Sequence, residues 1–241
     1  MKWKIIHIDE TDSTNRWLKD ELHNRDGSFC VITDYQTAGR GCGTNSWESE
    51  RGANLLFSIL IHPDWVTAAE QFLISMAISN AIRRALASYL FPPVEVKWPN
   101  DIYVGDGKIC GILIENQLQG SHIKDSIIGI GLNVNQTKFQ SDAPNPVSML
   151  NIDGRCQFSL NHVLNSVLNE FSDTLDNWQP DDIRREYRAH LYRREGFHRF
   201  HDADGSFEAR LLTVEDDGHL LLGDAEGRTR RYTFKEVQFV I

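Results

Sequence analysis

Two charged residues flank a short turn near the middle of this 241-residue sequence. Asp101 follows the run Lys97-Trp98-Pro99-Asn100, and Lys108 follows Asp106-Gly107, a dipeptide typical of two-residue β-hairpin turns. With a turn at Asp106-Gly107, Asp101 and Lys108 share one face of the hairpin on rungs about 13 Å apart. A carboxylate and an ammonium group at that spacing could bracket a small molecule whose two ends need different chemistry. The alternative is a solvated hairpin tip, where a lysine after Asp-Gly is common.

Two further segments concentrate polar side chains. Asp12-Ser13-Thr14-Asn15 offers hydroxyl and amide groups that donate and accept hydrogen bonds, although Ser13 and Thr14 are also candidate helix caps. Residues 36–52 are rich in Gly, Ser, Thr, Asn and charge, which predicts a mobile surface loop. A loop of that length without its own secondary structure is usually a functional lid or disordered.

The surrounding pattern predicts strands that alternate with amphipathic helices. We expect strands at 4–8, 30–35, 54–62, 94–97, 101–104, 108–118 and 122–133, and helices from Ser13 or Thr14 through Leu22, at 68–90, at 160–178 and at 183–192. After residue 192, short strands separated by Asp/Gly turns predict a small all-β unit. The fold class is therefore α+β, with a large domain at 1–191 and a small domain at 192–241.

Composition excludes several classes of protein. A net charge of -9 argues against a protein whose main partner is nucleic acid. No stretch resembles a signal peptide or is apolar enough to span a bilayer, so we expect a cytoplasmic protein without membrane contact. The four cysteines are widely spaced without a CxxC pair, which favours reduced thiols over disulfides or a zinc site. His198 and His201 would point to opposite faces of a strand, and we therefore expect no protein-bound metal there.

Taken together, the motifs resemble those of the biotin protein ligases. The order is DSTN at 12–15, Q-x-A-G-R-G at 36–41 with Trp47 downstream, KWPND at 97–101, K-x-x-GIL at 108–113 and GIGLNVN at 129–135. Each piece is weak alone, but the combination spans nearly the whole chain and is highly specific. The resemblance implies a catalytic domain like that of class II aminoacyl-tRNA synthetases and a C-terminal barrel like a Src-homology-3 domain.

The resemblance also implies a two-step reaction. Biotin and ATP give biotinyl-5'-adenylate, and biotin then passes to one lysine of a biotin carboxyl carrier protein. Joining a carboxylate to a triphosphate brings like charges together, so the site needs fixed cations, with Mg²⁺ on the phosphates. No GxxxxGK[ST] phosphate loop occurs, and the glycine-rich loop is expected to close as a lid that keeps water from the mixed anhydride.

Site residues follow from the resemblance position by position. The catalytic candidates are Lys108, Arg40 and Asp101, of which Asp101 would orient or deprotonate the acceptor lysine. The biotin-binding candidates are Ser13, Thr14, Asn15, Gln36, Gly39, Arg40, Gly41, Cys42, Lys108 and Gly111. The ATP-binding candidates are Arg40, Trp47, Asn100, Lys108 and Asn133. Structural alternatives are a loop tryptophan that anchors on the core for Trp47 and a strand cap for Asp101.

Two departures from the family pattern matter. Many relatives carry a second arginine two residues after the first, and Cys42 stands there instead. We expect weaker electrostatic retention of the adenylate, which an unchanged adenylate release rate in Cys42→Arg would contradict. The DSTN motif arrives too early for an N-terminal helix-turn-helix domain, which predicts a ligase alone. The alternatives are a lipoate or related acyl ligase and a non-catalytic biotin-binding regulator, and a homodimer is left open.

Overall fold

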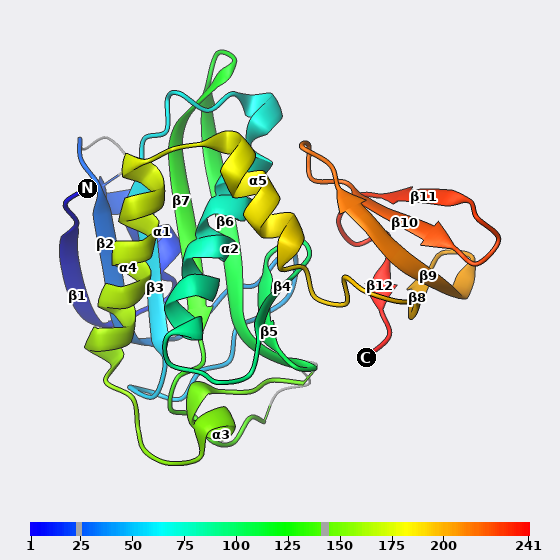
Figure 1. The fold of residues 1–241 in the computed structure, drawn as a ribbon. Helices are drawn as coiled ribbons and strands as arrows, with labels where there is room; N and C mark the ends of the chain where they lie inside the picture. The colour runs from blue at the N-terminus through cyan, green and yellow to red at the C-terminus, as the bar shows by residue number, and fades with distance from the viewer. Residues whose placement is uncertain (23–25, 141–144) are drawn as a thin grey trace.

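The computed structural model describes residues 1–22, 26–140 and 145–241, which form a large lobe and a smaller C-terminal lobe (Figure 1). The elements in chain order are β1 (Lys4–Thr11), α1 (Thr14–Leu22), β2 (Phe29–Gln36), β3 (Leu55–Ile61), η1 (Ala68–Glu70), α2 (Phe72–Ala87), β4 (Val94–Lys97), β5 (Asp101–Val104), β6 (Gly107–Gln119), β7 (His122–Leu132), α3 (Met149–Asp153), α4 (Leu160–Asp176), α5 (Pro180–Ala189), β8 (His198–Asp202), β9 (Gly205–Val214), β10 (Leu220–Asp224), β11 (Thr229–Tyr232) and β12 (Gln238–Phe239).

The large lobe is built on a seven-stranded mixed sheet of order β1-β2-β3-β7-β6-β5-β4. β1 pairs with β2 in parallel, and the other neighbours are antiparallel. Helices α2, α4 and α5 cover one face of this sheet (Figure 1). The main hydrophobic core lies between this face and the helices. Because side chains alternate along a strand, Ile59 and Ile128 face that core, while their neighbours Leu60 and Ile127 pack with Leu18 of α1 on the other face.

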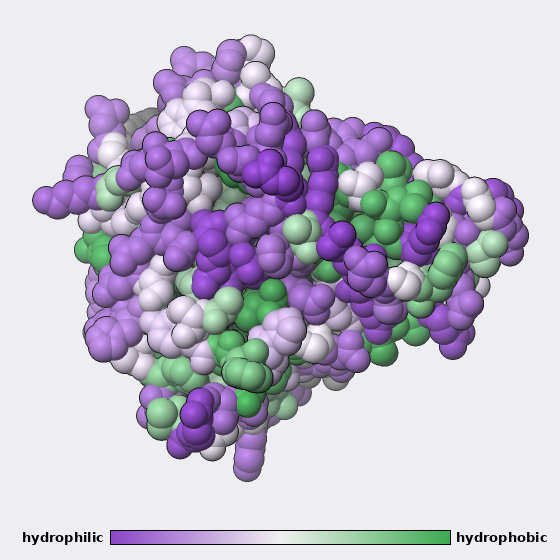
Figure 2. All heavy atoms as spheres, viewed as in Figure 1, coloured by the Kyte–Doolittle hydropathy of each residue, from purple (hydrophilic) through white to green (hydrophobic). Residues whose placement is uncertain are grey.

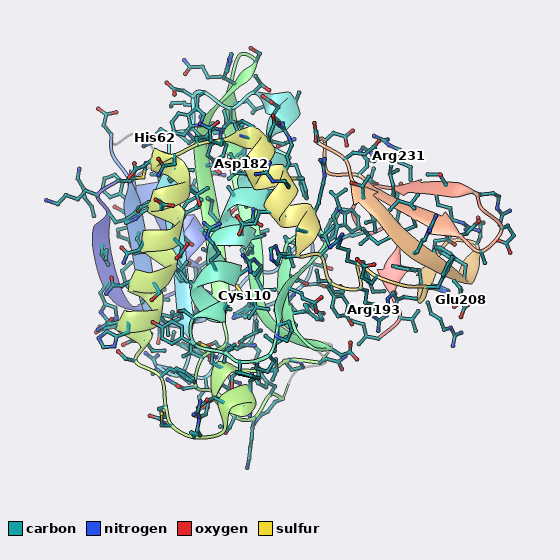
Figure 3. The ribbon with its side chains drawn as sticks, in the orientation of Figure 1. His62, Cys110, Asp182, Arg193, Glu208 and Arg231 are labelled. Atoms are coloured by element: carbon teal, nitrogen blue, oxygen red, sulfur yellow. The ribbon has the colours of Figure 1, made fainter. Side chains whose placement is uncertain are left out.

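The small lobe is a five-stranded antiparallel sheet of order β11-β10-β9-β8-β12. The structure therefore confirms the α+β class and the all-β character of the C-terminal part. Tyr192 donates its backbone N–H to the Val96 carbonyl of β4, and β8 begins six residues later. Arg193, labelled in Figure 3, lies between the lobes. The boundary at 191/192 stays a prediction.

Several element predictions need correction. The segment predicted as one helix at 68–90 divides into η1 and the shorter α2, whose last turn closes as Ser88 Oγ donates to the Ala85 carbonyl at 2.7 Å. The sequence reading missed α3, a five-residue helix that begins at the capping box of Ser148 and Asn151. Among the described helices, none is both long and apolar enough to cross a membrane.

The predicted turn at Asp106-Gly107 is wrong by one residue. Val104 pairs with Gly107, so the two turn residues are Gly105 and Asp106, and Gly105 takes the positive φ of 56°. A register shift follows, and Tyr103 pairs with Lys108 while Asp101 pairs with Gly111. The shift leaves one extra residue in β6, which reverses the inward and outward alternation of its side chains once more. Asp101 and Lys108 therefore share a face, as expected.

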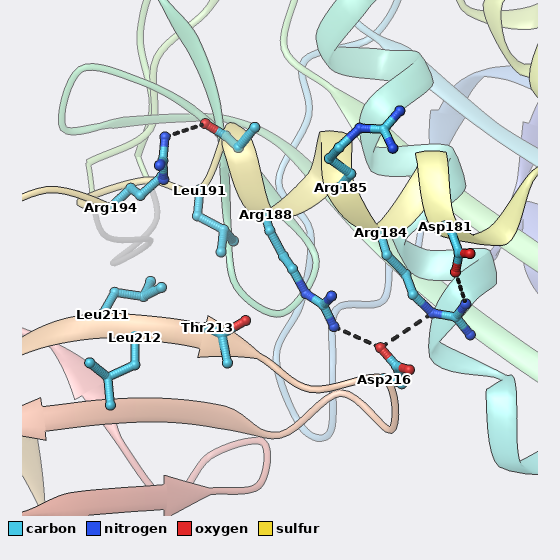
Figure 4. A pocket seen from close by; sticks show the side chains of 11 residues that line it. Asp181, Arg184, Arg185, Arg188, Leu191, Arg194, Leu211, Leu212, Thr213 and Asp216 are labelled. Atoms are coloured by element: carbon cyan, nitrogen blue, oxygen red, sulfur yellow. Dashed lines mark hydrogen bonds and ion pairs between the residues drawn. The ribbon is translucent and has the colours of Figure 1, made fainter.

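Ion pairs and a hydrogen bond connect the two lobes. Asp216, in the turn after β9, lies 2.7 Å from Arg188 Nη2 and 3.3 Å from Arg184 Nε, both on α5 (Figure 4). These residues line a cleft of about 560 Å³ between α5 and β9. Trp98 Nε1 donates to the Gly218 carbonyl at 2.8 Å, so the 97–101 segment is also tied to the small lobe.

Figure 2 shows hydrophilic residues over most of the viewed face and apolar residues gathered on the small lobe. Several exposed large apolar side chains belong to the C-terminal part: Phe197, Leu212, Phe234, Val240 and Ile241. Two of them, Phe234 and Ile241, line the same cavity as Asp101 and Lys108. The small lobe therefore forms part of the wall of that cavity.

Candidate active site

A cleft of about 1250 Å³ lies on the sheet face that α1 covers. Its lining comes from the start of α1, the 36–48 loop, the 97–101 segment, β6, β7 and the last eight residues of the chain. A typical site for one small ligand occupies about 300–1000 Å³. The volume is thus sufficient for two substrates that must meet.

Glycines form the floor of this cleft. Gly111 of β6 is paired directly with Gly131 of β7, and Gly129 follows two residues away on the same face. A Cβ at Gly131 would lie 2.3 Å from the Trp47 ring, and one at Gly129 would lie 2.3 Å from Asn15 Oδ1. The absence of side chains at these positions lets the indole and the amide rest on the strands.

Trp47 covers the glycine floor from the 36–52 loop. Its backbone N–H bonds the Gly39 carbonyl at 3.0 Å, and Lys108 Nζ lies 5.8 Å from the ring centroid. The indole Nε1 is buried and has no hydrogen-bond partner among the described residues. A buried donor without a partner is costly, so this nitrogen is suited to a ligand acceptor.

A buried polar network closes one end of the cleft. The Gln36 Oε1 atom accepts from the Thr14 backbone N–H at 2.8 Å and from the Thr14 hydroxyl at 3.1 Å. Ser58 Oγ lies 2.6 Å from both Thr14 Oγ1 and Asn15 Oδ1. Ser13 is 3% exposed beside them and lines the cleft. The Thr14 hydroxyl therefore contacts Gln36 and Ser58 in the wall of the cleft.

Arg40 reaches the cleft from the glycine-rich loop. Its guanidinium lies 3.3 Å from Glu115 Oε1, and Glu115 Oε2 also accepts from Asn15 Nδ2 at 2.8 Å. The loop itself forms a small ladder, with an antiparallel bridge between Arg40 and Ser46. Glu115 thus couples the arginine to the polar network of α1.

Lys108 and Asp101 meet on the opposite wall. Lys108 Nζ lies 2.8 Å from Asp101 Oδ1, so the two side chains are in contact and do not bracket the wide gap expected from the sequence. The shifted register brings their rungs closer, and the long lysine stem covers the rest. Lys108 is held on its other side by backbone bonds to Asn145 and Val147, at 2.8 and 3.0 Å.

Two asparagines fix the backbone around the cleft. Asn100 Nδ2 donates to the Ile112 carbonyl, and the Ile112 N–H donates back to the Asn100 carbonyl at 3.1 Å. Asn133 Nδ2 donates to the Val147 carbonyl at 3.2 Å, whereas its Oδ1 is buried without a partner among the described residues. That acceptor is suited to an exocyclic amine.

Lys97 is the third cation of the large lobe that lines the cleft. Its Nζ lies 5.2 Å from the Tyr103 ring centroid and 4.8 Å from that of Phe239, which belongs to β12 of the small lobe. Burial lowers the pKa of Lys97, and the nearby Asp101 carboxylate partly offsets that effect. Burial also raises the pKa of the Tyr103 hydroxyl.

Most of the residues predicted from the sequence line this one cleft, including Gly41 and Cys42. Gly39 does not line the cleft; a Cβ at this position would be 2.6 Å from the Trp47 carbonyl oxygen. The sequence reading missed Ser58, Glu115 and Lys235. A lone serine inside the apolar strand Leu55–Ile61 was a usable signal for Ser58, whereas contacts of Glu115 and Lys235 depend on tertiary structure.

One group outside the cleft has metal-ligand character. Ligand atoms of Glu215, Asp217 and His219 lie within 4.8 Å of one another. Arg231 lies 2.6 Å from Glu215 and 2.7 Å from Asp217, so one guanidinium bridges both carboxylates and compensates part of their charge. His198 and His201 bond separately to the Glu195 carbonyl and to Ser206.

Comparison with known proteins identifies the family. Residues 7–133, which include α1, the glycine-rich loop and the Asp101–Lys108 hairpin, match the model of the biotin/lipoate A/B protein ligase family. This chain belongs to that family. The bifunctional ligase/repressor BirA of Bacillus subtilis is 27% identical over 239 residues, which cover 95% of this chain and 72% of that protein. The biotin--[acetyl-CoA-carboxylase] ligase of Mycobacterium tuberculosis is 29% identical over 164 residues, 66% of this chain and 59% of that protein.

Solved structures of the biotin/lipoate ligase family share the fold. The biotin protein ligase of Aquifex aeolicus, in complex with biotin and ATP, superposes with a TM-score of 0.80 at 24% identity, over 98% of this chain and 99% of that one. The Leishmania major ligase in complex with biotinyl-5-AMP gives a TM-score of 0.68 at 22% identity, over 95% and 98%. The resemblance inferred from the sequence motifs is confirmed.

Proposed function

We propose that this protein is a biotin protein ligase that works in two steps. A carboxylate oxygen of biotin attacks the α-phosphorus of ATP, a new O–P bond forms, and the bond to the β-phosphate oxygen breaks to release pyrophosphate. The amine of an acceptor lysine then attacks the acyl carbon, the acyl–oxygen bond breaks, AMP leaves, and the amine proton passes to a base or to solvent.

One observation carries this proposal: a single cleft joins a buried hydroxyl and amide network to the cations Arg40 and Lys108. The network of Thr14, Asn15, Gln36 and Ser58 both donates and accepts hydrogen bonds, as the ureido ring of biotin requires. Lipoate lacks such a ring, so the network favours biotin within the family. Gly111 in the floor allows the ligand to approach the backbone of β6.

The other end of the cleft suits the nucleotide. Arg40 and Lys108 supply positive charge where two anions must approach each other. Within the described residues, Trp47 Nε1 and Asn133 Oδ1 have no hydrogen-bond partner, and we assign them to the base; Asn100 holds the wall in place. ATP brings Mg²⁺ on its phosphates, because Mg²⁺ binds through phosphate oxygens, a few carboxylates and retained waters. The lining includes two carboxylates, those of Glu48 and Asp101.

Asp101 is assigned to the second step. Its carboxylate lines the cleft next to Lys108 and can orient an incoming ammonium group and favour its deprotonated form by position. The acceptor is the lysine of a biotin carboxyl carrier protein of a biotin-dependent carboxylase. The relative from M. tuberculosis, named for acetyl-CoA carboxylase, supports this class of partner.

The test is the intact mass of an unmodified biotin carrier domain after incubation with the protein, MgATP and either biotin or lipoate. We expect the mass of one biotin to be added, and this addition to be lost in Lys108→Ala. Lys19→Ala, which removes an exposed lysine of α1 outside the cleft lining, is the matched control and should retain activity. Modification of a lipoyl carrier by lipoate would support the lipoate ligase instead, and biotin binding without acylation would support a non-catalytic regulator.

A further inference from the structure

Both family cations of the cleft are already paired with carboxylates. Arg40 lies 3.3 Å from Glu115, and Lys108 lies 2.8 Å from Asp101. Residues 41–47 of the glycine-rich loop contain no basic side chain. A site that must attract a triphosphate against a net charge of -9 therefore has little uncompensated positive charge from these two residues.

Lys235 of the small lobe reaches this loop. A Cβ built at Gly43 would lie 2.2 Å from Lys235 Nζ and 3.3 Å from its Cε, so the ammonium group rests against the backbone of the glycine-rich loop. Lys235 also lines the cleft. Within the described part of the chain, no carboxylate forms an ion pair with it. The adjacent Glu236 instead accepts from the Thr233 N–H at 2.6 Å.

The turn that carries Lys235 contacts the 97–101 segment between β4 and β5. Phe234 packs edge-on against Trp98, with ring centroids 6.5 Å apart. Trp98 is itself bonded to the Gly218 carbonyl of the small lobe. Lys235 has a φ of 73°, a region that residues other than glycine seldom adopt. The backbone conformation and the Trp98 contact together direct this side chain to the mouth of the cleft.

We propose that Lys235 binds the polyphosphate of ATP during adenylate formation, as a cation supplied by the C-terminal lobe opposite the glycine-rich loop. The inference rests on the proposed biotin ligase activity. In that step the biotin carboxylate attacks the α-phosphorus and pyrophosphate leaves, so negative charge builds on the departing phosphates. Because Lys235 forms no ion pair with a described residue, its ammonium group at the cleft wall stabilises that charge without first leaving such a partner.

The experiment measures biotin-dependent exchange of labelled pyrophosphate into ATP by the full chain. For Lys235→Ala and Lys235→Met we expect the KM for MgATP to rise about tenfold, less than the effect of a rigid buried donor because Lys235 is exposed. The KM for biotin and the melting temperature should stay unchanged. Lys235→Arg should restore most of the affinity for MgATP. The difference between wild type and Lys235→Ala should shrink as KCl screens the charge.

Lys19→Ala is the matched control, because it also removes one exposed lysine. The role of Lys235 would be overturned if the KM for MgATP rose equally in Lys19→Ala, or if it did not rise in Lys235→Ala while the wild type is active. Either result would leave the proposed ligase function intact. A defect confined to the KM for the carrier domain would also overturn this role and assign Lys235 to carrier docking. If the wild type shows no biotin-dependent exchange, the proposed function itself fails.

Discussion

Lys108 Nζ and Asp101 Oδ1 lie 2.8 Å apart, so the cation assigned to adenylation touches the carboxylate assigned to transfer. The two side chains are 24% and 19% exposed, and each compensates the charge of the other in the absence of substrate. In the proposed reaction, phosphate draws the ammonium group away and releases the carboxylate for the acceptor lysine. The proposed roles thus link the two steps through one ion pair.

Replacement of Asp101 by Asn should separate the two steps. We expect adenylate formation to change little, because Lys108 keeps its charge, whereas transfer to the carrier should fall about 100-fold through loss of the positioned base. Single-turnover transfer from preformed biotinyl-adenylate measures the second step alone. Asp106→Asn, in the exposed turn of the same hairpin, should transfer normally. Equal losses in both steps would instead place Asp101 in adenylation.

Ser58 should be needed for both stability and biotin binding. Ser58→Ala removes the hydroxyl that lies 2.6 Å from Thr14 Oγ1 and Asn15 Oδ1, and leaves buried polar groups without that partner. We expect a loss of about 1–3 kcal/mol in the free energy of unfolding and a higher KM for biotin. Urea unfolding and initial rates test the two effects.

Ser79 of α2 provides the control for Ser58. It is fully buried, and its hydroxyl has no partner within the described residues, so Ser79→Ala should be neutral or slightly stabilising. If Ser58→Ala and Ser79→Ala behave alike, the hydrogen bonds of the polar network contribute nothing specific to this site.

Gly131 should tolerate no side chain while Trp47 is present. A Cβ there would lie 2.3 Å from the indole, so Gly131→Ala should displace Trp47 and raise the KM for ATP. In a Trp47→Ala background the same change should cost little, giving an interaction energy of about 0.5–3 kcal/mol in a double-mutant cycle. Strict additivity of the two changes would show that the indole does not depend on the glycine floor.

Asp216 should hold the lobes together more than it stabilises the fold. It pairs with Arg184 and Arg188 of α5 at 3.3 and 2.7 Å. Because its side chain is 61% exposed, each ion pair should contribute only about 0.2–1 kcal/mol to the free energy of unfolding. Asp216→Ala should leave the melting temperature nearly unchanged and increase tryptic cleavage at Arg193 and Arg194, between the lobes. Asp204→Ala, on an exposed turn, should be cleaved like the wild type.

Much of the large lobe was predictable because local patterns and tertiary packing agree there. The continuous apolar run of β3 indicates a strand buried on both faces, and the broad apolar surface of α2 indicates a deeply buried helix. The hairpin register was not predictable, since Gly105-Asp106 and Asp106-Gly107 are both acceptable turns and the β5–β6 bulge decides between them. That one-residue choice determines whether Lys108 touches Asp101.

The candidate site was predictable by residue type and motif order, but its partners were not. Nothing local to Arg40 indicates Glu115, 75 residues away, and nothing local to Gly43 indicates Lys235 of the small lobe. These contacts form only when the sheet pairs and the lobes dock. Sequence motifs thus identify candidate site residues such as Arg40. The charged residues that lie beside them, Glu115 and Lys235, are found only from the tertiary structure.

Asp224 should make the stability of the small lobe depend on acid pH. Although burial opposes it, hydrogen bonds from Arg228 N–H and from the Arg228 and Arg230 guanidinium groups lower the pKa of Asp224 from 3.8 to about 2. A carboxyl whose folded pKa is depressed stabilises the fold above its unfolded value and loses that contribution as the pH falls through the folded one. The melting temperature of Asp224→Asn should therefore be lower than that of the wild type at pH 6. The difference between the two melting temperatures should become smaller as the pH falls below about 4. Asp204→Asn should have the melting temperature of the wild type. If the difference in melting temperature between Asp224→Asn and the wild type stays constant down to acid pH, the Asp224 carboxylate is not its source.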